Sequence, residues 1–372
     1  MDNVTTGRRR ILPQEYDVFM GVDTDKRSIA VTHLDHLGLG KSLKMPYDGQ
    51  MLLSFVSNHF AGKRVAFAYE AGPTGFGLYD EIVAGGHDCL VVAAASVPTP
   101  RNRRVRTNRL DSRKLAYQLR GGALVGIHVP SEAYRMLREL VTLRQQYVSE
   151  VRANKCRIKG LFLRNGLVFE WNTPGGYWSS EVLQGLRECD VNPVLRLKVS
   201  KLVDGLVFAQ YQASEAQRAI REFVSSTEEL KESVRLLMSI PGIGWVVASY
   251  ALARVGDWRE LGRSHEMASF FGLVPSEDST GEGADRGSIT KAGDPRMRSL
   301  LIQAAWSAIR KDDELNEFYK RTYKSHAQNA AARVAITAVA RKLTARMHCV
   351  LKERREYAVR PDAHKPSQAA AA

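Results

Sequence analysis

The order of apolar runs in the first 130 residues constrains the fold more than any other feature of this sequence. Three runs of strand type come first, DVFMGVDT, SIAVTHLD and KSLKMPY. A segment of helical period, MLLSFVSNHF, is followed by the strand RVAFAYEA, the short helix GLYDEIVAGG and the strand DCLVVAAAS. Three leading strands followed by alternating helices and strands predict an α/β domain over residues 14–130. Its mixed sheet should be antiparallel in the first hairpin and parallel afterwards.

The rest of the chain is of helical type. From Ser131, a good N-cap, apolar residues recur near the helical period among arginines and lysines. A break around EWNTPGGYW precedes a second long helical stretch, so we expect a helical hairpin or coiled-coil arm over residues 131–235. Residues 236–356 should form a mostly α-helical C-terminal domain. We expect residues 1–13 and 357–372 to be disordered.

Charge and cysteine usage narrow the class of partner. The formal net charge of +14 favours a polyanionic partner, with nucleic acid first. The four cysteines are scattered without a C-x-x-C pair, which argues against a zinc site and a disulfide framework and favours a reducing compartment. No apolar stretch reaches the roughly twenty residues of a membrane span, and MDNVTTGRRR lacks an apolar signal core. We therefore expect a cytoplasmic protein with no membrane partner.

Three carboxylates in the first third are candidates for a metal site. Asp23 ends the run VFMGVD, Glu70 ends RVAFAYE, and Asp111 lies in a basic stretch that runs into a helix. Strand ends that meet at one sheet edge would gather such acids, and clustered carboxylates favour a divalent metal. Each acid also has a structural explanation: a turn cap for Asp23, a salt bridge for Glu70 and a helix-dipole contact for Asp111.

A second candidate site lies far along the chain. The segment PSEDSTGEGADRGSITKAG, beginning at Pro275, combines hydroxyls with flexible glycines, so a protein side chain rather than water could be the attacking group. Upstream, IPGIG resembles a helix-hairpin-helix turn, in which Gly242 and Gly244 would let backbone N–H groups approach a phosphate. A simple helix junction would explain these glycines equally well.

Both regions resemble one family. GVDTDK, AYEAGPTGFGLY and RTNRLDSRKLA resemble the successive acidic motifs of the RuvC-like domain of IS110-family transposases, the DEDD recombinases of insertion sequences. The segment FFGLVPSEDSTGEGADRGSITKAGDPRMRSLL resembles the C-terminal transposase domain of the same family. The resemblance implies a RuvC-like, RNase H-like N-terminal fold and Mg²⁺ (or Mn²⁺). It also implies donor and target DNA, a noncoding bridge RNA, and a homo-oligomer, a dimer or tetramer.

The resemblance also implies roles for single residues. Asp23, Glu70 and Asp111 match three of the four acids, while Asn108 stands where the family has the fourth. An asparagine carbonyl can still ligate a metal, so we expect weaker or altered coordination. The family's nucleophile is a serine that becomes joined to DNA. Here the choice lies between Ser279 and Thr280, and we expect Ser279.

Other residues near these motifs have less specific roles. Ser288 is a further hydroxyl whose structural explanation is helix capping. Basic side chains beside both candidate sites are expected to neutralise DNA phosphates, although a solvated surface would explain any one of them. These are Arg101, Arg103, Arg104 and Arg106 near the acids, and Arg286 and Lys291 near the serine.

The sequence therefore predicts a DNA recombinase in which a serine hydroxyl attacks with metal assistance. One alternative is a RuvC-like endonuclease such as a junction resolvase, in which water attacks. A second alternative is a basic nucleic-acid-binding scaffold without catalysis.

Overall fold

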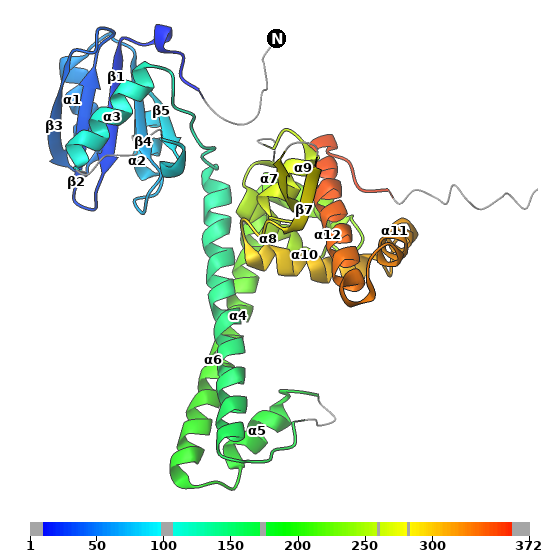
Figure 1. Ribbon diagram of the computed structural model, residues 1–372. Helices are drawn as coiled ribbons and strands as arrows, with labels where there is room; N and C mark the ends of the chain where they lie inside the picture. The colour runs from blue at the N-terminus through cyan, green and yellow to red at the C-terminus, as the bar shows by residue number, and fades with distance from the viewer. Residues whose placement is uncertain (1–9, 98–106, 172–175, 259–260, 281–282, 359–372) are drawn as a thin grey trace, which may run out of the picture. The chain divides into compact units, whose positions relative to one another are not determined.

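The computed structural model describes residues 10–97, 107–171, 176–258, 261–280 and 283–358; in the segment 277–286 the described part is backbone only. The chain divides into two compact units (Figure 1). The first ends at Val129, and the second begins at Pro130. The finer boundary expected between residues 235 and 236 stays a prediction.

The first unit is built on a five-stranded mixed sheet with the order β3-β2-β1-β4-β5. Its strands are β1 (Val18–Thr24), β2 (Ser28–Leu34), β3 (Gly40–Pro46), β4 (Val65–Glu70) and β5 (Asp88–Val92). β1 pairs antiparallel with β2, and β2 with β3, whereas β1–β4 and β4–β5 are parallel. The mixed α/β sheet expected from the sequence is confirmed.

Helices cover both faces of this sheet. They are α1 (Gly49–His59), α2 (Gly77–Ala84) and α3 (Asn108–Arg120), with short 3-10 turns η1 (Pro13–Glu15) and η2 (Ala94–Ser96). Side chains alternate along β1: Met20 and Val22 belong to one buried cluster, with Leu52 of α1, and Phe19 belongs to the other, with Leu115 of α3. This alternation is the period of two that a strand imposes. Ile11 is also buried in the second cluster, so the chain packs on the unit from that residue onward.

The second unit begins with the long helices expected from the sequence. They are α4 (Glu132–Arg164), α5 (Ser180–Glu188) and α6 (Pro193–Ser226), and α4 and α6 lie side by side (Figure 1). Ser131 occupies the N-cap position of α4, but its side chain makes no capping hydrogen bond. Arg144 of α4 donates from Nε to Gln217 Oε1 of α6 at 2.5 Å. Among the described residues, no helix combines the length and apolar character that a membrane span requires.

The remainder of the second unit is helical, as predicted, apart from one hairpin. Its elements are α7 (Glu228–Met238), α8 (Trp245–Val255), α9 (Ser264–Phe270), β6 (Pro275–Thr280), β7 (Gly283–Ile289), α10 (Pro295–Ala308), α11 (Asp313–Lys324) and α12 (Gln328–Glu353). The antiparallel pair β6–β7 was not predicted from the sequence. The expected helix-capping role of Ser288 is wrong, because Ser288 lies inside β7.

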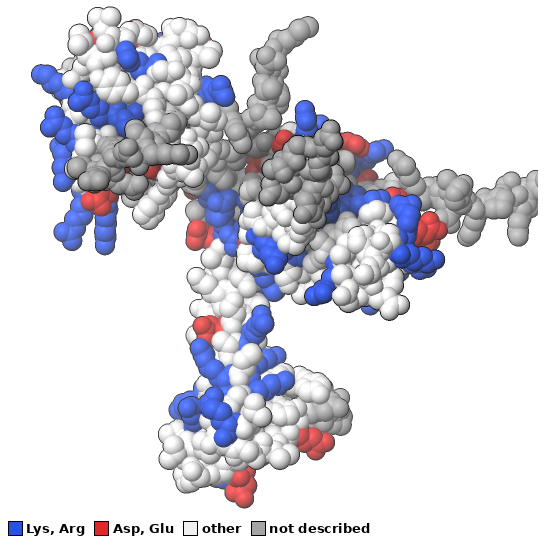
Figure 2. All heavy atoms as spheres, in the orientation of Figure 1, with Lys and Arg blue, Asp and Glu red and all other residues white. Residues whose placement is uncertain are grey.

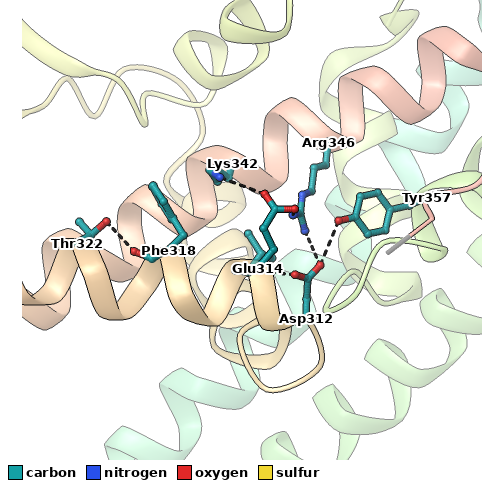
Figure 3. A network of polar contacts seen from close by, with 8 residues as sticks. Asp312, Glu314, Phe318, Thr322, Lys342, Arg346 and Tyr357 are labelled. Atoms are coloured by element: carbon teal, nitrogen blue, oxygen red, sulfur yellow. Dashed lines mark hydrogen bonds and ion pairs between the residues drawn. The ribbon is translucent and has the colours of Figure 1, made fainter. Parts of the chain in front are cut away.

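A buried ion network joins three segments of this unit (Figure 3). The side chain of Asp312 is inaccessible to solvent and lies 2.7 Å from Arg346 of α12. It also caps α11 by accepting from the Leu315 backbone N–H at 3.0 Å. Tyr357 donates its hydroxyl to the same carboxylate at 3.2 Å. The chain after α12 is therefore tied to the start of α11 as far as Tyr357.

Candidate active site

Parallel pairing of β1 and β4 carries two of the candidate acids to one edge of the sheet. Val22 pairs with Tyr69, and Asp23 and Glu70 are the next residue of each strand. Both side chains are partly buried. The hydroxyl of Tyr69 donates to the Gly75 carbonyl at 3.2 Å, which holds the loop that follows Glu70. The two carboxylates therefore leave the sheet side by side.

Close packing of α3 on β1 brings the third acid to this edge. A Cβ added to Gly21 would lie 2.1 Å from the carbonyl oxygen of Ser112 and 2.4 Å from the Ala116 nitrogen, so a larger residue would push α3 away. Thr107 caps the helix by accepting from the Leu110 N–H at 3.3 Å. Asp111 lies in the first turn, where the helix dipole favours a negative charge.

Electrostatic coupling shows that the three acids are gathered. The pKa of Asp23 is raised from 3.8 to about 6, first because burial removes water from its carboxylate. The negative charges of Asp111 and then Glu70 raise it further, with Asp25 contributing least. Within the described ranges, no three His, Cys, Asp or Glu side chains already stand in a metal-binding arrangement. The three acids therefore interact electrostatically, but their side chains are not already arranged to coordinate a metal.

The chemistry of this group suits a divalent cation. Its donors are carboxylate oxygens, which Mg²⁺ and Mn²⁺ prefer, and mutual repulsion of the carboxylates is what a cation between them would relieve. Asn108 is the exposed first residue of α3, one turn before Asp111 along the helix. The residues present therefore fit the metal that the acidic motifs imply.

The serine-containing segment lies in the second unit. Ser279 is on β6, where its backbone pairs with Ala284 of β7, and Thr280 pairs with Gly283. The side chains of Ser279, Thr280 and Arg286 lie outside the described part of the structure. Lys291 is exposed and has a left-handed backbone, with φ of 54°.

The two glycines of the α7–α8 turn differ in their surroundings. Gly242 has φ of 87°, and a Cβ there would lie 2.4 Å from the Ala304 carbonyl of α10. Backbone conformation and packing against α10 are thus sufficient reasons for that glycine. Gly244 faces open space. Phosphate binding by either glycine stays a prediction.

Four arginines expected to bind DNA phosphates cannot be placed, because Arg101, Arg103, Arg104 and Arg106 lie outside the described residues.

Two packing features around the acids were not predicted from the sequence. Sequence reasoning missed the packing role of Gly21, although a glycine inside an apolar strand signals close backbone approach. It also missed a buried hydrogen bond of 2.9 Å between Thr32 of β2 and Ser112 of α3. A threonine in the middle of the run SIAVTHL was the available signal.

Comparison with known proteins agrees with this arrangement. A family model for transposases of the DEDD type matches residues 20–165, which include the three acids. A second model, described as the transposase IS116/IS110/IS902 family, matches residues 234–320, which include β6 and β7. The protein named as transposase y4qE of Sinorhizobium fredii is 31% identical over 311 residues, 81% of this chain and 74% of that protein.

Two further relatives extend the comparison. The transposase for insertion sequence element IS1533 of Leptospira borgpetersenii is 22% identical over 300 residues, 78% of this chain and 84% of that protein. The pilin gene-inverting protein of Moraxella bovis is 27% identical over 139 residues, 37% of this chain and 42% of that protein.

Fold, acids and matches together define a DNA transposase with a DEDD domain of RNase H-like architecture. The chain belongs to the IS116/IS110/IS902 family of transposases.

Proposed function

We propose that this transposase cuts and rejoins DNA strands through metal-assisted attack by the hydroxyl of Ser279. The observation that carries the proposal is the gathering of Asp23, Glu70 and Asp111: burial first, and then the charges of Asp111 and Glu70, raise the pKa of Asp23 to about 6. Such a cluster is unfavourable without a cation and is typical of phosphodiester chemistry. The gene-inverting name of the Moraxella bovis relative supports rejoining as well as cutting, because inversion requires both.

The protein's own residues have distinct tasks in this scheme. Asp23, Glu70 and Asp111 would hold the divalent metal, with the side-chain carbonyl of Asn108 as a neutral fourth donor. When bound, the metal supplies positive charge that stabilises the phosphodiester in its transition state. The neutral amide leaves the set one negative charge short of four carboxylates, so we expect weaker metal affinity than an aspartate at position 108 would give.

Attack by serine keeps the DNA phosphate in a phosphodiester bond to the protein, and the rejoining step can then use that bond. As the Oγ–P bond of Ser279 forms, the serine hydroxyl gives up its proton, the P–O bond to the leaving strand breaks, and the leaving oxygen takes up a proton in its place. The freed strand hydroxyl later attacks the phosphoserine, which restores the serine and forms a new phosphodiester. No outside energy source is required, because the number of phosphodiester bonds is unchanged.

We further propose that a noncoding RNA guides target choice and that several protomers assemble on donor and target DNA. Family membership supports both proposals. The net charge of +14 suits two polyanionic partners.

Covalent trapping tests the nucleophile. Protein incubated with Mg²⁺, the element's RNA and substrate DNA should give a protein–DNA adduct that survives denaturation. Ser279→Ala should abolish it, whereas the matched variant Thr280→Ala should retain it. Strand cleavage without an adduct would favour the water-using nuclease, and an adduct lost only in Thr280→Ala would move the nucleophile by one residue. Unchanged recombination in Asp23→Ala and Glu70→Ala would reject the metal site and favour the scaffold.

A further inference from the structure

A polar cavity of about 360 Å³ lies between α3 and the β2–β3 edge of the first unit. Its lining includes Lys41 and Ser42 of β3, Thr32 of β2, and Arg109, Arg113 and Tyr117 of α3. Figure 2 shows Lys and Arg side chains gathered on the visible face of this unit. The cavity is of the size that small ligands occupy in proteins.

Among the described residues, three cations around this cavity have no carboxylate as an ion-pair partner. Lys41, Arg109 and Arg113 form no ion pair with any residue that the structure describes. The guanidinium of Arg113 lies 5.5 Å from the centre of the Tyr117 ring and donates to its hydroxyl at 3.4 Å. Positive charges held together without neutralisation attract an anion, and guanidinium groups match the oxygens of a phosphate.

A chain of hydroxyls fixes the floor of the cavity. Thr32, which is 2% exposed, lies 2.8 Å from Ser42 and 2.9 Å from Ser112, measured between hydroxyl oxygens. Ser112 donates to the Arg109 carbonyl at 3.0 Å. With that proton committed, Thr32 donates to Ser112, and Ser42 donates to Thr32. The hydroxyls therefore anchor the first turn of α3 to the sheet and leave ligand binding to the cations.

We propose that this cavity binds a phosphate group of the DNA backbone, distinct from the phosphate that reacts. Asp111 is two residues from both Arg109 and Arg113, which is about 200° around the helix, so the cavity and the acids lie on different sides of α3. A DNA strand bound both at the cavity and at the acids would be held on two sides of α3. The proposal rests on the proposed function for its choice of DNA as ligand.

A matched pair of lysines on β3 provides the test. Lys41 lines the cavity, whereas Lys44 is an exposed lysine on the same strand outside it. Binding of the full chain to labelled duplex DNA is measured by fluorescence anisotropy in EDTA at several salt concentrations, so that no strand transfer occurs. Lys41→Gln should weaken binding about tenfold and lower the slope of log affinity against log salt by about one. Arg113→Gln should behave alike, and Lys44→Gln should change neither quantity.

Three other outcomes would overturn the assignment of this cavity to a DNA phosphate. Equal effects of Lys41→Gln and Lys44→Gln would mean a diffuse charged surface. Weakened binding to RNA of the same sequence, with DNA binding unchanged, would assign the cavity to RNA. Inorganic phosphate that slows hydrogen exchange in α3 of the wild type, while Lys41→Gln binds DNA normally, would indicate a small-molecule site. Because binding in EDTA needs no nucleophile, an adduct that persists in Ser279→Ala would refute the proposed function and leave this result standing.

Discussion

Asp23→Asn should stabilise the first unit at neutral pH while it removes a metal ligand. The rise in the pKa of Asp23 from 3.8 to about 6 sets an upper limit of ~3 kcal/mol, at about 1.4 kcal/mol for each tenfold change in acidity. Solvent reaches part of the carboxylate, so we expect ~1–2 kcal/mol. The folded protein holds the Asp23 proton more tightly than the unfolded chain, so stability falls as pH rises from about 4 to about 6.

Hydrogen exchange measures the difference in stability between Asp23→Asn and the wild type in the strands that carry the acids. In EDTA at pH 7.5, peptides covering β1 and β4 should exchange roughly 5–30-fold more slowly in Asp23→Asn than in the wild type. Near pH 4 the two proteins should exchange alike, because Asp23 is then protonated. Asp25→Asn is the matched control, since Asp25 is exposed and contributes least to the shift. Equal or faster exchange in Asp23→Asn at pH 7.5, or a gain that persists at pH 4, would refute the electrostatic reasoning.

Four further outcomes are expected. Mg²⁺ should slow exchange of β1 in the wild type and much less in Asp23→Asn, because the cation relieves repulsion only where the carboxylate is present. Gly21→Ala should cost ~3 kcal/mol in the same assay, since its Cβ would overlap α3, whereas Gly77→Ala, in open space, should be nearly neutral. Asp312→Asn should destabilise the second unit by ~1–3 kcal/mol, because Arg346 loses its buried carboxylate partner and keeps only its ion pair with the half-exposed Glu314. Tryptophan fluorescence during urea unfolding follows that change, because all five tryptophans come after residue 130. Thr32→Val should cost ~1–3 kcal/mol by breaking the hydroxyl chain, and urea unfolding followed by exchange in α3 measures it.

Sequence patterns predicted the parts of the fold that local periodicity determines. The strands that carry Asp23 and Glu70 were visible as apolar runs, and α4 as a helical repeat. The β6–β7 hairpin was missed because PSEDST and GADRGSI are small and charged, without apolar alternation. The two segments form strands because they pair with each other, and not because their residues have a high strand propensity.

The acids of the candidate site could be predicted from the sequence, but the packing contacts that bring them together could not. Asp23, Glu70 and Asp111 were identified as chemical types at strand and helix ends. Their gathering depends on Gly21, whose role follows from contact with a helix almost a hundred residues later. The cavity depends in the same way on side chains of β3 and α3 that are distant in sequence. Such contacts leave no periodic signal in a single sequence.

Mass spectrometry of the trapped protein–DNA adduct tests the central claim most directly. Protein is incubated with Mg²⁺, RNA and DNA, denatured, and digested with protease and nuclease. The account predicts a nucleotide phosphate attached to the peptide that contains Ser279, with fragment ions that locate it on that serine, and no such species in Ser279→Ala or in Asp23→Ala. Cleaved DNA with no modified peptide, or a nucleotide attached to a residue outside β6, would contradict it.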